Sequence, residues 1–479
     1  MAEEKPGGPV ENAPSARGVA TDQSGGPTLG EDGAGEGSGG VRRNVFAIAG
    51  RALRHRNFRL FTVGQSISLI GTWMQQVAVG WLVYRLTDSP FLLGLVGFVA
   101  QGPTFLLAPI AGVLADRYNK RTLVILTQTG MMVQAIVLAG LVLTETVTIP
   151  AVVVLMGVLG ALSGLDIPAR QSFLVEMVDD REDLPNAIAL NSSVFNGARL
   201  IGPAIAGLVV AAVGEGLCIL INAVSYGAVL GSLFLMRTPK REIHRGPVLG
   251  QLISEGFRYV YGFRPLRSIL LLVAFVSLVA VPFTVLLPVI ATDVLGGGAE
   301  TLGFLMAAVG LGALAGALYL ASRTTVRGLS RVIVSAALLF GVSLVALAFS
   351  RTFWFSLVCL AVAGFGMMAQ MASSNTVLQT IVDDDKRGRV MSMYSMAYIG
   401  MAPLGALAGG ALASAIGAPL TIALGGLGCM VGAAVFARHL PALRAQIRPI
   451  YTRLGIIPEV AGGIQAVTHS TRPRTGDGT

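Results

Sequence analysis

Charge is scarce in this 479-residue chain, because Lys, Arg, Asp and Glu together make up 13% of it. Soluble proteins carry about 25% charged residues, so roughly half of the usual charge is missing. Hydrophobic residues make up 53%, and the mean hydropathy is +0.70. The apolar residues form runs rather than an amphipathic period, which excludes a soluble helical bundle. The sequence therefore predicts a membrane protein.

Residues that bind metals or nucleotides are also scarce. The three cysteines, Cys218, Cys359 and Cys429, fall at wide spacing inside apolar runs, where they are expected to act as small buried hydrophobes. The four histidines lie outside these runs, and no Gly-x-x-x-x-Gly-Lys-[Ser/Thr] phosphate loop is present. We therefore expect no disulfide, metal or other cofactor, and a secondary transporter rather than an enzyme.

Twelve apolar segments of about 20 residues predict an all-α polytopic membrane protein with two six-helix halves. The first six lie near 60–84, 91–115, 122–143, 150–171, 187–212 and 217–236. The second six lie near 267–291, 302–321, 331–350, 355–376, 391–415 and 418–437. The expected regions are a disordered cytoplasmic tail (1–50), the first half (51–236), a cytoplasmic linker (237–265), the second half (266–438) and a cytoplasmic C-terminal tail (439–479).

The net charge is +9, and its basic residues lie in short clusters between the apolar runs, where they orient the spans rather than bind nucleic acid. With the N-terminus inside, the outer turns hold only Arg85 and Arg351. The inner loops hold the other clusters: Arg117, Lys120, Arg121, Arg181, Arg237, Lys240, Arg241, Arg245, Arg323, Arg327, Lys386, Arg387, Arg389, Arg438 and Arg444. We expect a multi-pass protein of the plasma (inner) membrane with both termini cytoplasmic.

A weak internal repeat supports two parallel halves. Leu114-Ala-Asp-Arg117 follows the second span, and Leu320-Ala-Ser-Arg323 follows the eighth. The fifth span contains Gly202 and Pro203, and the eleventh contains Pro403. These residues predict helix bends that serve alternating access between the halves, although close helix packing alone would also explain them.

The strongest local motif is Gly112-Val-Leu-Ala-Asp116-Arg117-Tyr-Asn-Lys120-Arg121. It resembles the loop between the second and third helices of the major facilitator superfamily. The resemblance implies a conformational switch, in which Asp116 contacts the start of the eleventh span near Gly388 and Arg389. The alternative is a basic loop that only sets topology.

Further stretches resemble the enterobactin-exporter and macrolide-efflux branch of that superfamily, whose members are drug:proton antiporters. They are Asn57-Phe-Arg-Leu-Phe-Thr-Val-Gly-Gln65, Gly71-Thr-Trp73-Met-Gln75, Asp166-Ile-Pro-Ala-Arg170-Gln and Asp183-Leu-Pro-Asn186-Ala-Ile-Ala-Leu-Asn191. The fourth span lacks the Arg-x-x-Gln-Gly pattern of the best-known drug antiporters, so their coupling residue is not carried over. The resemblance implies export.

Charge inside the spans is rare and therefore informative. Asp166 is the only acid expected within a span, and Arg170 shares its helix face four residues on. Arg199 falls near the middle of the fifth span and needs an anionic partner. These three residues are predicted to couple protons or to gate, with Arg199 as the partner of Asp166 or as an anion-binding group. A static salt bridge is the alternative.

Polar residues along the first span predict a substrate cavity. Gln65, Thr72 and Gln76 share one face, and Trp73 and Gln370 are expected to join them around a large polar ligand. Hydrogen bonding between helices would explain the same residues equally well. In the linker, 249–264 predicts an amphipathic helix at the inner surface.

Three classes of function remain open. The resemblance favours a proton-coupled exporter of a siderophore, macrolide or other drug-like amphiphile. An importer or symporter of the same fold is the second reading, because direction depends on coupling. A membrane receptor or enzyme is the third, and the missing metal and nucleotide motifs disfavour it. For the exporter we expect a small-molecule substrate, protons as the coupling ion, the lipid bilayer, no nucleic acid and a monomer.

Overall fold

The computed structural model describes residues 51–178, 180–236, 258–323 and 325–456, all within one compact unit spanning 49–479. Within helices, the side chains at 108, 109, 111–113, 115 and 116 are likewise not described. The predicted N-terminal tail, most of the linker with its amphipathic helix, and the end of the C-terminal tail lie outside the described residues.

The first half consists of η1 (Arg51–Arg54), α2 (Arg56–Thr87), α3 (Pro90–Arg117), α4 (Lys120–Leu143), α5 (Ile149–Glu176), η2 (Arg181–Asp183) and α6 (Leu184–Leu235). α6 contains two spans, because Gly214 adopts φ 83° and ψ 171° and turns the chain back. Every long helix of this half therefore corresponds to one or two predicted crossings.

The second half begins with α8 (Arg264–Val279), η3 (Val281–Leu286), α9 (Leu287–Val289) and η4 (Ile290–Val294), which together form one span. α10 (Ala299–Ala321), α11 (Leu329–Phe349) and α12 (Phe353–Ile381) form the next three. α13 (Asp384–Ser395), η5 (Met396–Gly400) and α14 (Met401–Ile416) form the eleventh, and α15 (Ala418–Arg453) forms the last.

The predicted twelve-span fold is confirmed. Ten helical stretches of the described chain are long and apolar enough to cross a membrane, and one of them, Arg181–Leu235, contains the two crossings on either side of Gly214. The 32-residue helix α2 supplies the remaining crossing. α2 is not among the ten apolar stretches because its glutamines lower its mean hydropathy.

The last helix is longer than we expected. The sequence placed the end of the span near 437, but α15 continues to Arg453 through Pro441 and Pro449. Buried residues recur at helical spacing along this extension: Leu440, Leu443, Ile447 and Tyr451. Their burial offsets the hydrogen bonds that the two prolines remove. Residues 439–453 therefore form a packed helical extension of the last span.

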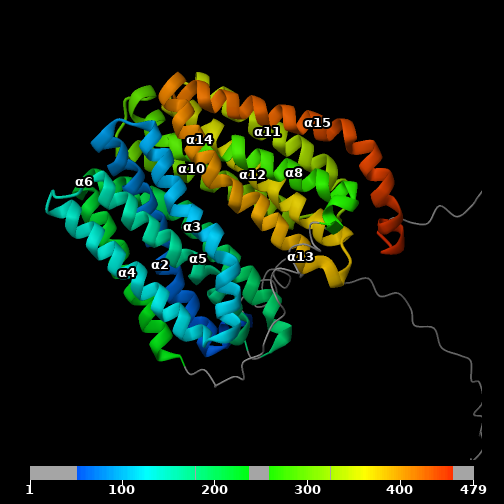
Figure 1. The fold of residues 1–479 in the computed structure, drawn as a ribbon, viewed down its shortest axis with the longest axis horizontal. Helices are drawn as coiled ribbons and strands as arrows, with labels where there is room; N and C mark the ends of the chain where they lie inside the picture. Colours follow the sequence, from blue (N-terminus) through cyan, green and yellow to red (C-terminus); the bar gives the residue numbers. More distant parts are fainter. Residues whose placement is uncertain (1–50, 179, 237–257, 324, 457–479) are drawn as a thin grey trace, which may run out of the picture. The chain divides into compact units, whose positions relative to one another are not determined.

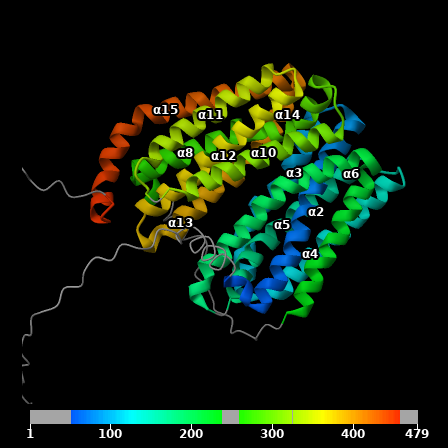
Figure 2. The ribbon, with the colours of Figure 1, turned by 180° about the vertical axis from the view of Figure 1, so that it is seen from behind.

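The two halves meet along two pairs of helices. α3 lies beside α14 (Figures 1 and 2), and α6 packs against α10. At the first crossing, a Cβ at Gly410 would lie 2.8 Å from the Gly94 Cα atom. At the second, a Cβ at Gly303 would lie 2.7 Å from the Gly207 Cα atom. Because backbone atoms cannot yield as a side chain can, both crossings depend on glycine.

Candidate functional site: a cavity between the halves and a buried polar network

A cavity lies between the halves, and both contribute to its wall. Its polar and aromatic lining residues are Trp73, Gln76, Gln101, Arg199, Thr284 and Tyr398. An adjoining pocket of about 350 Å³ shares several of these residues and extends among α2, α3 and α5. Val285 and Met306 line both spaces and give them an apolar wall. A mostly apolar space with few polar groups is the usual form of a small-molecule site.

Three of the five residues predicted for a cavity lie in this lining, namely Thr72, Trp73 and Gln76. Gln65 and Gln370 lie elsewhere, 3% and 1% exposed within their own halves. Gln65 stands two helical turns from Thr72, where neighbouring Gly64 packs closely on α6 and closes the space.

Sequence reasoning missed Gln101, Thr284 and Tyr398. Gln101 is an isolated polar residue within the apolar run 91–115, and that isolation was an available signal. Thr284 and Tyr398 gave no such signal, because their exposure to the cavity depends on irregular helical turns, η3 and η5. Local departures from regular helix therefore place part of the lining.

Arg199 carries the positive charge of the cavity. Its guanidinium carbon lies 5.8 Å from the centre of the Trp73 ring, a cation–π distance. Phe195, one helical turn earlier, packs edge-on against the same ring at 5.9 Å. No acidic side chain of the described residues lines either space. The site therefore offers a cation and an aromatic face, with no counter-ion among its described lining residues.

The predicted bend residues differ in their surroundings. Pro203 lacks the N–H that would bond to the Arg199 carbonyl, yet α6 stays helical there and departs from helix only at Gly214. Gly202, beside it, lets Trp73 approach, since a Cβ at this position would lie 2.6 Å from the Trp73 Cβ atom. Pro403 follows the π-helical turn Met396–Gly400, so the irregular backbone lies in the eleventh span.

Asp166 is buried in the first half, at 2% exposure, and accepts three hydrogen bonds. One carboxylate oxygen accepts from the Thr127 hydroxyl at 2.9 Å and from Gln128 Nε2 at 3.0 Å. The other oxygen accepts from Arg170 Nε at 2.9 Å. The structure thus brings Asp166 and Arg170 together despite the intervening Pro168, whereas Arg199 lies on α6 at the cavity.

A second set of buried polar groups joins α2, α4 and α6. Gln75 Nε2 donates to Gln134 Oε1 at 3.3 Å, and Asn222 Nδ2 donates to Gln75 Oε1 at 2.5 Å. Asn222 is fully buried, and Ser225 Oγ donates to its carbonyl at 2.7 Å. Since Gln75 also lines the adjoining pocket, this network connects the pocket wall to the interior of the first half.

The loop motif lies at the end of α3 and the start of α4. Gly112 and Asp116 are helical, but the side chain of Asp116 lies outside the described part, and Arg117 is exposed. Lys120 Nζ lies 2.8 Å from Glu176 Oε1 at the end of α5. Arg121 donates to the Leu233 and Phe234 carbonyls at the end of α6, at 2.9 and 3.3 Å. Both cations therefore bind within the first half.

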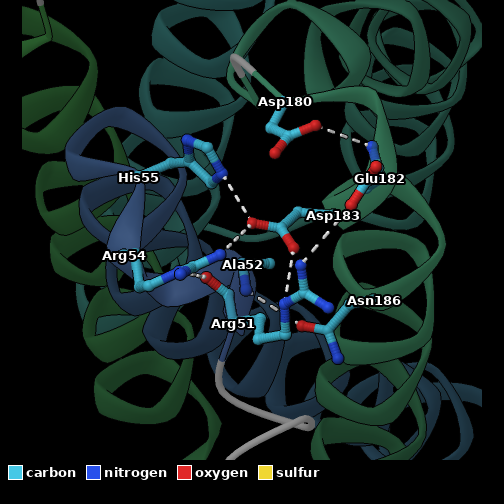
Figure 3. A network of polar contacts seen from close by, with 8 residues as sticks. All are labelled: Arg51, Ala52, Arg54, His55, Asp180, Glu182, Asp183 and Asn186. Atoms are coloured by element: carbon cyan, nitrogen blue, oxygen red, sulfur yellow. Dashed lines mark hydrogen bonds and ion pairs between the residues drawn. The ribbon is translucent and has the colours of Figure 1, made fainter.

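A cluster of polar contacts ties η1 to the turn before α6 (Figure 3). Asp183 is 1% exposed, forms ion pairs with Arg51 at 3.0 Å and Arg54 at 2.9 Å, and has His55 Nε2 at hydrogen-bond distance, 3.1 Å. The hydrogen bond from Arg54, followed by the one from His55, holds the pKa of the Asp183 carboxyl below its usual value. The Asp183-Leu-Pro-Asn186 motif thus anchors the chain that enters the first span.

At the opposite ends of the helices, a hydrogen bond between described residues joins the halves. The Tyr84 hydroxyl of α2 donates to Asp293 Oδ2 of η4 at 2.6 Å. The neighbouring Arg85 pairs with Glu215 at 2.6 Å within the first half. Together with the glycine crossings, this contact holds the two halves against each other at these ends.

Residues 49–451 match the model of a protein family described as Transmembrane secretion effector. The Staphyloferrin A transporter of Staphylococcus aureus is 26% identical over 383 residues, covering 79% of this chain and 95% of that protein. The Multidrug efflux pump Tap of Mycolicibacterium fortuitum is 28% identical over 390 residues, covering 78% of this chain and 93% of that protein. The Enterobactin exporter EntS of Shigella boydii is 27% identical over 390 residues, with 79% and 86% covered.

The fold also resembles a solved bacterial homologue of the human lysosomal transporter Spinster, in an inward-facing and unoccupied conformation. The TM-score is 0.63 at 15% identity, covering 86% of this chain and all of that one. This likeness shows the fold alone. With the family match, it confirms the predicted resemblance to the major facilitator superfamily.

Proposed function

Because the chain belongs to the Transmembrane secretion effector family of the major facilitator superfamily, we propose that it exports an amphiphilic small molecule in exchange for protons. Membership of this family makes the chain a multi-pass membrane transporter and not an enzyme. Siderophores and drug-like amphiphiles are the proposed substrates. The observation that supports this most is the cavity lined by both halves, because alternating access requires one site that each half can uncover in turn.

The chemistry of the lining favours an anionic or neutral substrate rich in acceptor groups. Arg199 and Trp73 together suit a carboxylate or hydroxyl group beside an apolar or aromatic moiety. Gln76 and Gln101 add amide donors. A lipophilic cation would meet Arg199 without a compensating carboxylate among the described lining residues. The site therefore disfavours cations.

The positive-inside rule supports a cytoplasmic location for both termini. In that orientation, the glycine crossing at Gly410 and the contact of Tyr84 with Asp293 lie toward the outside and close that entrance. Lys120 and Arg121 bind within the first half at the inner ends. The present arrangement therefore corresponds to an inward-open state, ready to receive a cytoplasmic substrate.

Asp166 is the proposed coupling carboxylate. Three donors surround it in the inward-open state, which suits a carboxylate that has released its proton to the cytoplasm. Protonation of this carboxylate would remove its charge and so weaken its pair with Arg170. Loss of that pair would loosen the inner half of α5 and bias the protein toward another state.

The test uses vesicles that contain the purified protein, an imposed pH gradient and a pH-sensitive dye. Carboxylate siderophores, macrolides and lipophilic cations are added in separate experiments. We expect carboxylate siderophores to trigger proton movement, and Arg199→Gln to raise their half-saturating concentration about tenfold. Arg351→Gln in an outer turn is the matched control and should not. Proton movement with the cations alone would overturn the proposal.

A further inference from the structure

A groove of about 530 Å³ lies between α8 and α15, away from the cavity between the halves. Its polar end holds Arg264, Arg267 and His439. In the topology proposed above, on which the groove's assignment to the inner leaflet depends, this end is the inner one. The remaining wall is apolar and belongs to two neighbouring spans, the seventh and the twelfth.

The cations of the groove have no protein counter-ion in the described chain. No acidic residue lines the groove. Arg267 lies over the Tyr261 ring, with its guanidinium carbon 5.1 Å from the ring centre, which fixes the charge without neutralising it. At the start of α13, Asp383 and Asp384 pair with Lys386 and Arg387. The groove therefore presents two arginines that have no acidic partner among the described residues and can bind an anion.

The apolar part of the groove is long enough along the helices to hold a segment of a lipid acyl chain. Phe275 lies eight residues beyond Arg267, and Val431 lies eight residues before His439, each about 12 Å along a helix. Leu272 and Phe436 are 5% exposed and form a floor. Val431 is 60% exposed at the rim, facing the surroundings of the protein.

A glycine on α15 explains where the groove ends. A Cβ at Gly432 would lie 3.0 Å from a Phe275 ring atom, so α8 and α15 are in contact at this level. Toward the cations, Ser268 and Leu271 line the opposite wall from Ala442 and Gln446. The groove is thus open at the membrane surface and closed toward the bilayer centre.

We propose that this groove binds one anionic phospholipid of the inner leaflet, with the phosphate at Arg264 and Arg267 and an acyl chain over Phe275 and Phe436. Basic pockets between spans on the cytoplasmic side suit anionic headgroups. The chain's own linker is a poor occupant, because 237–263 contains five Lys or Arg against two Glu and would be repelled. Charge and shape therefore select a lipid over this neighbouring segment.

The experiment is native mass spectrometry of the full chain in a neutral detergent, titrated with palmitoyl-oleoyl phosphatidylglycerol or with the matching phosphatidylcholine. We expect phosphatidylglycerol to bind about tenfold more tightly. Arg264→Gln with Arg267→Gln should remove this preference. Arg448→Gln with Arg453→Gln, which removes equal charge from exposed positions of α15 outside the groove, should keep it.

A second variant tests the apolar part without touching a charge. Val435→Trp, at a rim position that is 49% exposed, should weaken binding of both lipids about tenfold by filling the groove. This variant also tests lipid binding in the groove if the double arginine variant fails to fold. Equal affinity of the wild type for the two lipids would overturn the proposal. So would an equal loss in the control pair, or competition by soluble glycerol phosphate at the lipid's concentration.

Discussion

The two six-helix halves share a topology but differ in what their interiors contain. The first half buries the Asp166 and Arg170 pair and the Gln75 and Asn222 network. In the described part of the second half, acids lie only near the ends of spans, and the buried polar side chains are neutral, such as Gln370.

The backbones of the two halves also differ, and here the second half is the more irregular one. All described 3₁₀ and π-helical turns inside spans belong to the second half: Val281–Leu286, Ile290–Val294 and Met396–Gly400. Such turns leave the regular hydrogen-bond ladder and allow bending, whereas buried polar networks make a bundle rigid and specific. We infer that the first half holds the charge-sensitive element and that the second half bends around the substrate.

The largest expected effect comes from breaking the ion pair of the first half. Arg170→Met leaves the carboxylate of Asp166 buried without its cation, which costs about 3–5 kcal/mol. We expect a clear fall in the midpoint of thermal unfolding in detergent. Adding Asp166→Asn to the same chain should recover most of the loss, because no unpaired charge remains.

The matched change in the second half is Gln370→Leu. Its amide nitrogen is buried without a hydrogen-bond partner among the described residues, so replacing it should cost little or stabilise the protein. If Gln370→Leu destabilised the protein as much as Arg170→Met, the contrast between the halves would be wrong.

The next effect concerns the boundary between the halves. A Cβ at Gly410 would lie 2.7 Å from the Pro90 carbonyl oxygen, so Gly410→Val should prevent closure at that end and favour the opposite state. We expect a cysteine that replaces Gln101 to be labelled about tenfold faster by a reagent added from outside. The labelling is done in a variant whose three native cysteines, Cys218, Cys359 and Cys429, are replaced; all three are buried.

Gly227→Val is the control for this labelling, because a Cβ there meets nothing within 4 Å. Unchanged labelling in Gly410→Val would mean that the halves do not separate at the crossing of α3 and α14.

Bending of the second half predicts a smaller, kinetic effect. Pro403→Ala restores an N–H after the π-helical turn and should stiffen the eleventh span. We expect turnover in vesicles to fall about fivefold with little change in half-saturation. Pro203→Ala should slow transport less, because α6 is already helical at that position. The reverse order of effects would place the bending element in the first half.

The smallest effect is confined to acid pH. Because the pKa of Asp183 is held below its usual value, its ionised form stabilises the fold at neutral pH. This contribution is complete above the unfolded-state pKa, near 3.8, and is lost as pH falls through the lower folded-state pKa. Asp183→Asn should therefore lower the unfolding midpoint at neutral pH, and the difference from wild type should shrink only below about pH 4. A difference that grew on acidification would contradict this.

The sequence was sufficient for the spans and for the pairing of Asp166 with Arg170. Apolar runs of bilayer length predicted every crossing, and the four-residue spacing placed Asp166 and Arg170 on one helix face. Thr127 and Gln128 could not be anticipated as partners, because they lie on α4 and reach Asp166 only after α4 packs on α5.

Errors arose where packing overrides local pattern. The continuation of α15 past Pro441 depends on burial of Leu443 and Ile447, which the sequence does not show. The seven-residue spacing put Gln65 and Thr72 on one face of α2, but Gln65 is buried where neighbouring Gly64 packs on α6, whereas Thr72 lines the pocket. Helical periodicity identifies a face, and neighbouring helices decide how far along it the cavity extends.

The most direct test of the account is to separate proton coupling from substrate movement with Asp166→Asn. Wild-type vesicles should show both gradient-driven transport and exchange of labelled for unlabelled substrate without a gradient. We predict that Asp166→Asn loses gradient-driven transport and retains exchange, because the cavity at Arg199 and Trp73 is intact while the coupling carboxylate is neutral. Retention of gradient-driven transport at the wild-type rate would contradict the central claim.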